Sequence, residues 1–184
     1  MNILAVDLGT TSGWATITED RLQLGSHRLA TDAEVKHWVK HRLDRRIDPR
    51  PLRLYDFLAA FPKPDLIVFE DVQFQTYTKQ TQLWSSLRTA VWFLARTLGI
   101  SCECVPVSVL KKFATGHGGA TKGMMCSALC RRFPDRFGPC GKEAVSETLF
   151  GGASPIRVNV FDDNAVDAAW LAMWAQHNLS RMTL

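Results

Sequence analysis

The chain has 184 residues, a net charge of +4, 46% hydrophobic residues and 22% charged residues, which is the composition of one globular domain with a real core. No apolar stretch is long enough to span a membrane, and the N-terminus lacks the features of a secretory signal, so we expect a cytoplasmic protein. The odd number of cysteines, five, argues against a disulfide framework.

The first third of the chain predicts a three-stranded antiparallel meander followed by helical structure. The predicted strands are residues 2–7, 13–18 and 22–29, and the last two are joined by a turn at Glu19. Residues 32–61 are predicted to be helical, with a break near Pro49 and Pro51, because proline disrupts a helix interior.

The remainder of the chain alternates buried strands with helices. The predicted strands are residues 64–71 and 101–107, and the predicted helices are residues 78–98, 107–115, 121–133 and about 163–178. Residues 134–160 are rich in Gly and Pro and carry no assignment. This order predicts a single α/β domain over residues 1–184, with a mixed five-stranded sheet made of the antiparallel meander plus two parallel strands and flanked by helices.

Four acidic residues are predicted to meet at the carboxyl ends of the strands. Asp7 ends the first strand, Glu70 ends a later one, and Asp163 and Asp167 share a face at the start of the last helix. Any one of them alone is better explained as a structural turn or helix-cap residue. Together they predict a Mg²⁺ site, in which two ions would hold the oxygens of a phosphodiester undergoing hydrolysis. The neighbouring Asp162 and Asp71 are interpreted as bystanders, with the alternative that either one exchanges roles with its neighbour.

Positive charge is concentrated in residues 36–53, which favours a polyanionic partner. A solvated helix face is the alternative interpretation. The residues predicted to grip phosphates along a DNA arm are Arg42, Arg45, Arg46, Arg50 and Arg53.

Two other site types are weighed against this hypothesis. The segment DLGTTS is also typical of the first phosphate loop of actin-like ATPases and sugar kinases, but 184 residues are too few for their two lobes, so we expect no nucleotide cofactor. Cys126, Cys130 and Cys140, with His117, lack the paired short spacing of structural zinc sites, and their helical pattern favours core packing.

The ordered set of motifs resembles RuvC-type Holliday junction resolvases of the ribonuclease H-like superfamily. The motifs are AVDLGTTSGWA, IVFEDVQF, VSVLKKFATGHGGATK and DDNAVDAAWLA, and they span nearly the whole chain. The resemblance implies a homodimer that binds four-way DNA junctions in DNA recombination and repair, and that cuts two opposed strands symmetrically with Mg²⁺ or Mn²⁺. It also implies that Lys111 and Lys122, with Lys112 nearby, contact DNA or assist at the scissile phosphate, and that Phe74 packs against bases at the junction centre.

The last motif departs from the family pattern. The family places its final two ligands three residues apart, whereas here Asn164 lies three residues before Asp167 and Asp163 lies four before it. We favour Asp163 as the ligand because a charged oxygen suits Mg²⁺ better than an amide. This departure and the basic insertion at residues 36–53 resemble phage or prophage versions, which implies a bacterial or phage-infected host cell.

Three alternatives stay open. One is a nuclease that acts more broadly on branched DNA, and a second is a YqgF-like RNA-processing nuclease. The third is a catalytically silent DNA-binding module, although such a module would be expected to have lost one of Asp7, Glu70 and Asp167. The helix over residues 78–98 supplies either the dimer contact, with Trp84 and Trp92, or only cover for the sheet.

Overall fold

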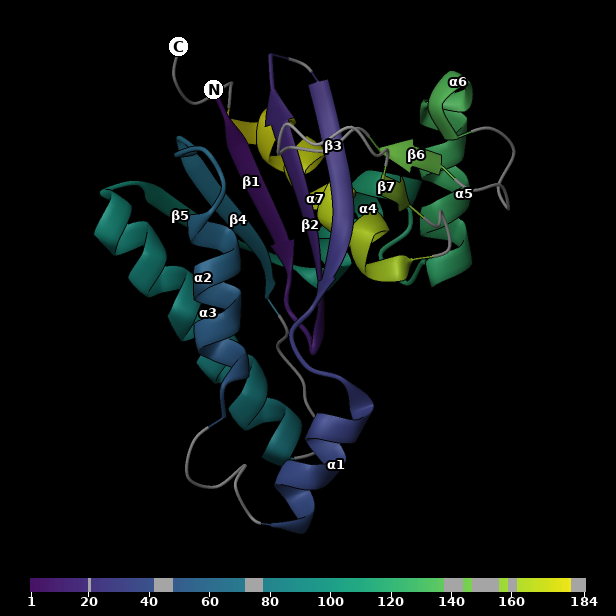
Figure 1. The fold of residues 1–184 in the computed structure, drawn as a ribbon. Coiled ribbons are helices and arrows are strands. Elements are labelled where there is room, and N and C mark those ends of the chain that lie inside the picture. The colour runs from purple at the N-terminus through teal and green to yellow at the C-terminus, as the bar shows by residue number, and fades with distance from the viewer. Residues whose placement is uncertain are drawn as a thin grey trace.

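A computed structural model describes residues 1–19, 21–41, 48–71, 78–137, 144–146, 156–158 and 162–179 (Figure 1). The main sheet has five strands, which are β1 (Ile3–Asp7), β2 (Thr11–Thr18), β3 (Arg21–Arg28), β4 (Leu66–Asp71) and β5 (Ser101–Pro106). Their order across the sheet is β3-β2-β1-β4-β5, in which β1 to β3 are antiparallel neighbours and β4 pairs in parallel with both β1 and β5. The predicted meander and the two added parallel strands are therefore confirmed.

Helices cover both faces of this sheet. Those assigned to the main body are α2 (Arg50–Ala59), α3 (Thr78–Leu98), α4 (Val107–Thr115), α5 (Lys122–Arg132) and α7 (Asp163–Leu179). The helices α2 and α3 lie on one face, and α7 lies on the other with α4 and α5 packed beside it (Figure 1). The helix α7 is buried on nearly all sides because it is held between the sheet and these helices.

The predicted break in the first helical region is confirmed, and the prolines mark the start of a new helix. The helix α1 (Asp32–Lys40) ends before the break, and α2 begins after it. Pro49 is the N-cap of α2 and Pro51 occupies its first turn, where proline is tolerated because the missing N–H would be unpaired anyway.

The segment left unassigned by the sequence contains three short elements. They are α6 (Pro134–Phe137) and the strands β6 (Ala144–Ser146) and β7 (Ile156–Val158), which pair antiparallel in a separate small sheet. Across the described part of the chain, no helix combines the length and the apolar character that a membrane span needs.

The alternation of side chains along the central strands decides what each face receives. On β1, Ile3 and Ala5 face α7, whereas Leu4 and Val6 face α2 and α3. On β4, alternation likewise directs Leu66 and Val68 to the α7 face and Ile67 and Phe69 to the other. The same alternation decides which face of the sheet receives each side chain at the carboxyl ends of these strands.

Candidate active site

Asp7 and Glu70 lie side by side at the carboxyl edge of the sheet. Asp7 is the last residue of β1, and Glu70 is the penultimate residue of β4. These strands are parallel, with Val6 beside Phe69, so the register sets the two acids next to each other. Both point to the α7 face, because strand side chains alternate and the residues two positions earlier face α7. Asp7 and Glu70 therefore lie at the same edge of the sheet and on the same face of it.

The start of α7 passes very close to β2. A Cβ atom on Gly13 would lie 1.8 Å from the backbone oxygen of Asn164, so a side chain there would push the helix away. Asp162 caps this helix, since its carbonyl oxygen accepts the N–H of Val166 at 3.1 Å and its carboxylate accepts the N–H of Asn164 at 3.1 Å. The half-buried Asp167 follows one turn into the helix. The close approach therefore carries a third acid towards the strand ends.

The pKa values show that the three acids act on one another. Burial raises the pKa of Asp7 well above its usual range, and the charges of Glu70 and Asp167 raise it further. Burial and then the charge of Asp167 raise the pKa of Glu70 to about 7. Burial raises the pKa of Asp167 to about 6, against the opposing charge of Lys122. At neutral pH this edge therefore favours a bound proton or a bound cation.

Two lysines supply positive charge to the same edge. The Nζ atom of Lys122 lies 3.0 Å from Oδ2 of Asp163, and this hydrogen bond raises the pKa of Lys122. The charge of Lys122 lowers the pKa of all three acids, and the half-buried Lys111 of α4 lowers the pKa of Glu70 and of Asp167. Both lysines expected near the scissile phosphate thus lie within electrostatic reach of the carboxylates.

Asp163 lies at the rim of this cluster. Its side chain is 41% exposed and is engaged by Lys122. The charge of Asp163 raises the pKa of Asp167, whereas Asp162 is the acid at this helix start that raises the pKa of Asp7. This contribution bears on the alternative that Asp162 and Asp163 exchange roles, which stays a prediction. The position of Asp162 directly before the helix, where Asp is a preferred cap, is its local signal in the sequence.

The donor set suits a hard divalent cation. Carboxylate oxygens are the ligands that Mg²⁺ prefers, and the raised pKa values of Asp7, Glu70 and Asp167 show that burial, with repulsion from neighbouring carboxylates, disfavours their charged forms unless a cation is present. Among the described residues, no three His, Cys, Asp or Glu side chains are already gathered at ligating distance around one point. Mg²⁺ does not require such a cage, because it keeps several waters and binds through one or two carboxylates plus a substrate phosphate.

Two of the cysteines weighed as zinc ligands lie in the core. Cys126 and Cys130 are buried in the core between α5 and α7. His117 uses its Nδ1 atom to accept the N–H of Gly119 at 3.1 Å. Cys140 lies outside the described residues.

Several of the predicted DNA contacts fall in parts of the chain that are not described. These residues are Phe74, Arg42, Arg45 and Arg46. Lys112 is described and is exposed on α4. The remaining two, Arg50 and Arg53, belong to α2 and have well-defined partners within the chain.

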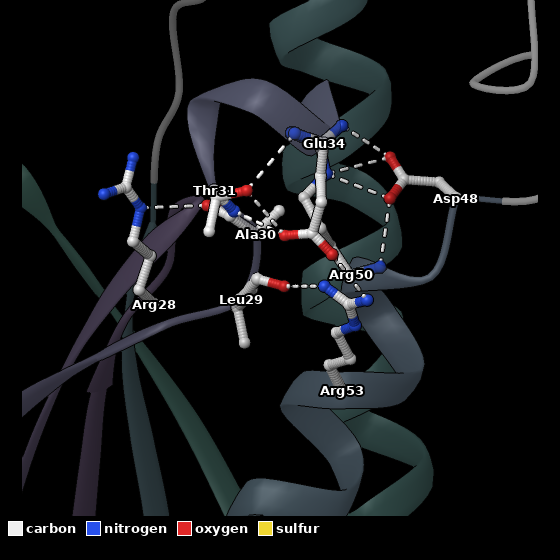
Figure 2. Close-up of polar contacts among 8 residues, drawn as sticks. All are labelled: Arg28, Leu29, Ala30, Thr31, Glu34, Asp48, Arg50 and Arg53. Atoms are coloured by element: carbon white, nitrogen blue, oxygen red, sulfur yellow. Dashed lines mark hydrogen bonds and ion pairs between the residues drawn. The ribbon is translucent and has the colours of Figure 1, made fainter. Parts of the chain in front are cut away.

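Arg50 ties the start of α2 to the turn that follows Asp7. Its Nε atom donates to a carboxylate oxygen of Asp48 at 2.9 Å (Figure 2), and its Nη1 atom donates to Oγ1 of Thr10 at 3.0 Å. Only 13% of the Arg50 side chain is exposed. This guanidinium group is therefore directed into the protein, and any contact of Arg50 with DNA stays a prediction.

Arg53 connects α2 to the root of α1, by which we mean the start of this helix together with the neighbouring start of α2. It donates to the carbonyl oxygen of Leu29 at 2.7 Å and to a carboxylate oxygen of Glu34 at 3.0 Å (Figure 2). Its guanidinium carbon also lies 5.7 Å from the centre of the Trp38 ring, in cation–π geometry. Arg53 thus has a structural role that the sequence prediction of a phosphate contact did not include.

Comparison with solved structures places this site on a known scaffold. No protein-family model and no curated protein sequence matches the chain. Thermus thermophilus RuvC in complex with a Holliday junction substrate matches with a TM-score of 0.61 and 16% identity, over 100% of this chain and 96% of that one. The chain has the RuvC fold.

Two other solved structures agree with this assignment. Thermus thermophilus RuvC in a separate structure gives a TM-score of 0.56 and 18% identity, over 100% of this chain and 97% of that chain. The yeast mitochondrial Holliday junction resolvase Ydc2 gives a TM-score of 0.55 and 12% identity, over 99% and 84%. The likeness covers the whole chain, so the predicted fold class, a RuvC-type ribonuclease H-like sheet, is confirmed.

Proposed function

We propose that the protein is a metal-dependent, structure-selective DNA endonuclease that resolves four-way junctions by paired symmetric nicks. The observation that carries the proposal is the meeting of Asp7, Glu70 and Asp167, with raised pKa values, at the strand ends of a RuvC fold. A fold alone does not define an activity, but a fold that holds uncompensated carboxylates beside two lysines supports phosphodiester hydrolysis.

In this proposal Asp7, Glu70 and Asp167 hold Mg²⁺ or Mn²⁺, in two ions per site, with Asp163 as the fourth ligand candidate. When bound, such ions activate water and stabilise the charge on the phosphate. The reaction forms a bond from a water oxygen to phosphorus and breaks one bond from phosphorus to a sugar oxygen; the attacking water gives up a proton and the leaving sugar oxygen takes one up from solvent to become a hydroxyl. Lys111 and Lys122 stabilise the negative charge that develops on the phosphate oxygens.

Symmetric paired nicks require two active sites, so we propose a homodimer. The outer surface of α2 and α3 supports this proposal, because Leu52, Trp92 and Phe93 are exposed there and an apolar groove runs between the two helices. Trp84, the other tryptophan predicted at the dimer contact, is buried under Arg88, whose guanidinium carbon lies 4.5 Å from its ring centre. Trp84 therefore contributes cover for the sheet, and Trp92 and Phe93 remain as contact candidates.

The proposal is tested by cleavage of a labelled four-way junction in Mg²⁺, in Mn²⁺ and in EDTA. The parent protein, Asp7→Asn and the control Asp56→Asn, which neutralises an exposed acid of α2, are compared. We expect paired nicks in metal with the parent and the control, and none with Asp7→Asn. Flap, duplex, single-stranded DNA and RNA substrates are run beside the junction.

The substrate panel decides between the open alternatives. Equal cleavage of junctions and flaps would replace a resolvase with a broader branched-DNA nuclease. Cleavage of RNA alone would favour the RNA-processing alternative. Binding without any cleavage would contradict the enzyme and leave a DNA-binding module. A DNA nuclease of this kind would act in the cytoplasm of a bacterial or phage-infected cell.

A further inference from the structure

The helix α1 stands apart from the rest of the described chain. None of its residues is buried, although it is a regular helix with a complete N-terminal capping box at Thr31 and Glu34. Figure 1 shows it beyond the carboxyl ends of β1 and β4, the end at which α7 also begins. A nine-residue helix that buries nothing gains little from core packing, so other contacts must hold it in place.

Both acids of α1 form ion pairs at the start of the helix. Asp32 forms an ion pair with Arg28 at 2.7 Å, and Glu34 forms one with Arg53 at 3.0 Å. The capping-box hydrogen bonds from Thr31 and the pairing with Arg53 lower the pKa of Glu34 to about 2. Both acids therefore fasten the first turn of α1, and neither is available to neutralise the later turns.

The last two turns of α1 carry a face of one charge sign. Lys36, His37, Lys40 and His41 are all exposed, and their spacing puts them on one side of the helix. Among the described residues neither lysine forms an ion pair with a carboxylate, and His37 and His41 stack with ring centres 4.5 Å apart. The opposite side carries the half-buried Val35 and Trp38.

Two like charges one helical turn apart repel each other, so this arrangement needs a reason. The helix dipole favours basic residues near a helix C-terminus, but it does not require that all four lie on one face. A polyanion lying along the face would offset the repulsion of Lys36 and Lys40, and the imidazoles beside them would add hydrogen-bond donors. Charge complementarity therefore points to a phosphate backbone as the occupant.

We propose that this face, the α1 basic face of Lys36, His37, Lys40 and His41, contacts the backbone of a DNA arm as it leaves the active-site end of the molecule. The inference rests on the proposed function for the identity of the substrate. This changes the role of the basic insertion at residues 36–53. Arg50 and Arg53 make contacts within the chain at the start of α1 and α2, and the lysines and histidines of the α1 basic face are the side chains that contact phosphates. The contact is with phosphates, so it carries no sequence preference.

The test measures binding of a labelled four-way junction in EDTA by fluorescence anisotropy over a series of salt concentrations. The variant K36Q/K40Q removes two charges from the α1 basic face. The matched control K63Q/R96Q removes two exposed charges near the amino edge of the sheet, where β4 and β5 begin. Melting curves of both variants verify that the fold is retained, as expected for exposed side chains.

We expect K36Q/K40Q to bind the junction several-fold more weakly and to reduce the slope of log affinity against log salt by about 2, since each phosphate contact contributes about 1. The control should keep the parent slope. Shortening the arms of the junction should reduce the affinity of the parent and erase its difference from K36Q/K40Q.

An unchanged salt slope for K36Q/K40Q, with the parent binding DNA normally, would overturn the inference and leave the proposed function standing. An equal loss of slope in K63Q/R96Q would also overturn it, because net charge would then be the cause. Binding with the expected slopes but without cleavage would contradict the nuclease and support the α1 contact. A parent that binds no DNA at all would overturn both.

Discussion

Two groups of carboxylates in this protein have pKa values that are shifted in opposite directions. At the root of α1, Glu34 and Asp48 are paired with arginines; hydrogen bonds from Thr31 and Arg53 lower the pKa of Glu34 to about 2. Burial acts to raise the pKa of Asp48, but the hydrogen bonds from Arg50 outweigh it and lower that pKa. At the strand ends, burial raises the pKa values of Asp7, Glu70 and Asp167, and the charge of at least one neighbouring carboxylate raises each of them further.

The difference separates structural acids from candidate functional ones. The root of α1 is complete within the chain, because each acid already has its cation. Among the described residues, only Lys111 and Lys122 offset the acids at the strand ends, and Lys122 is engaged by Asp163. A cluster that remains short of positive charge in the folded protein is suited to bind a cation from outside.

The largest effect should come from removing one charge from the strand-end group. We expect Glu70→Gln to reduce junction cleavage on the order of 10³-fold, because the charge that holds a cation at the phosphate is lost. Asp71→Asn is the matched control, since Asp71 is the next residue of β4 but faces Arg88 at 4.0 Å on the other side of the sheet. Similar losses of cleavage in Glu70→Gln and Asp71→Asn would contradict the proposal that the acids on the α7 face of the sheet carry out the reaction.

A side chain at position 13 should break the geometry that brings Asp167 to the strand ends. Gly13→Ala would set a Cβ atom 1.8 Å from the Asn164 oxygen, and we expect about 2–4 kcal/mol of lost stability with a collapse of cleavage. Gly123→Ala in α5 is the control, because its new Cβ atom would meet nothing closer than 4.0 Å and alanine favours a helix. Urea unfolding of the two variants measures the contrast, and equal stability would contradict the close packing of α7 on β2.

The paired acids of the α1 root predict a smaller but definite loss of stability. Arg50→Ala leaves the half-buried Asp48 without its cation and removes the hydrogen bond to Thr10. We therefore expect the free energy of unfolding to fall by about 2–3 kcal/mol. Arg28→Ala breaks an exposed pair with Asp32 and should cost less than about 1 kcal/mol. Thermal unfolding compares them, and an Arg28→Ala loss as large as that of Arg50→Ala would remove the distinction between the two pairs.

The pH dependence of stability should have opposite signs in the two groups. With its pKa raised from 4.5 to about 7, Glu70 binds a proton more tightly in the folded state, so the free energy of unfolding falls as pH rises between these values. Without metal, Glu70→Gln should therefore be more stable than the parent at pH 8, by about 1–2 kcal/mol, and should match it near pH 4.5.

Glu34 provides the opposite case. Its pKa is lowered to about 2, so its contribution is present above pH 4.5 and is lost as pH falls towards 2, and Glu34→Gln should destabilise the protein at neutral pH. Melting temperatures across pH 3 to 8 in EDTA measure both variants. A Glu70→Gln protein that is less stable than the parent at pH 8 would show that the strand-end acids are compensated within the chain.

Local sequence signals were sufficient for the parts of the site carried by strands. Asp7 and Glu70 each follow a buried apolar run, and two parallel neighbouring strands leave such residues at one edge whatever the rest of the fold does. The long helix at residues 78–98 was likewise predictable from its periodicity and its stop at Gly99. These features depend on short stretches of chain and on one rule of sheet geometry.

The parts that were missed depend on contacts between distant segments. The charge run at residues 36–53 gave no sign that Arg50 would reach Thr10, or that Arg53 would reach Leu29 and Glu34. The ion pair of Asp163 with Lys122 joins two helices and has no local signature. Residues 134–160 offered no periodicity, so the pairing of β6 with β7 could not be foreseen.

The most direct test of the account is whether the strand-end acids bind a divalent cation. Titration of Mn²⁺ into the protein at pH 7, followed by electron paramagnetic resonance of the free ion, measures binding without any nucleic acid. The account predicts binding by the parent and by Glu34→Gln, with loss in Asp7→Asn and in Glu70→Gln. Equal Mn²⁺ binding by all four proteins, or no Mn²⁺ binding by the parent, would contradict it.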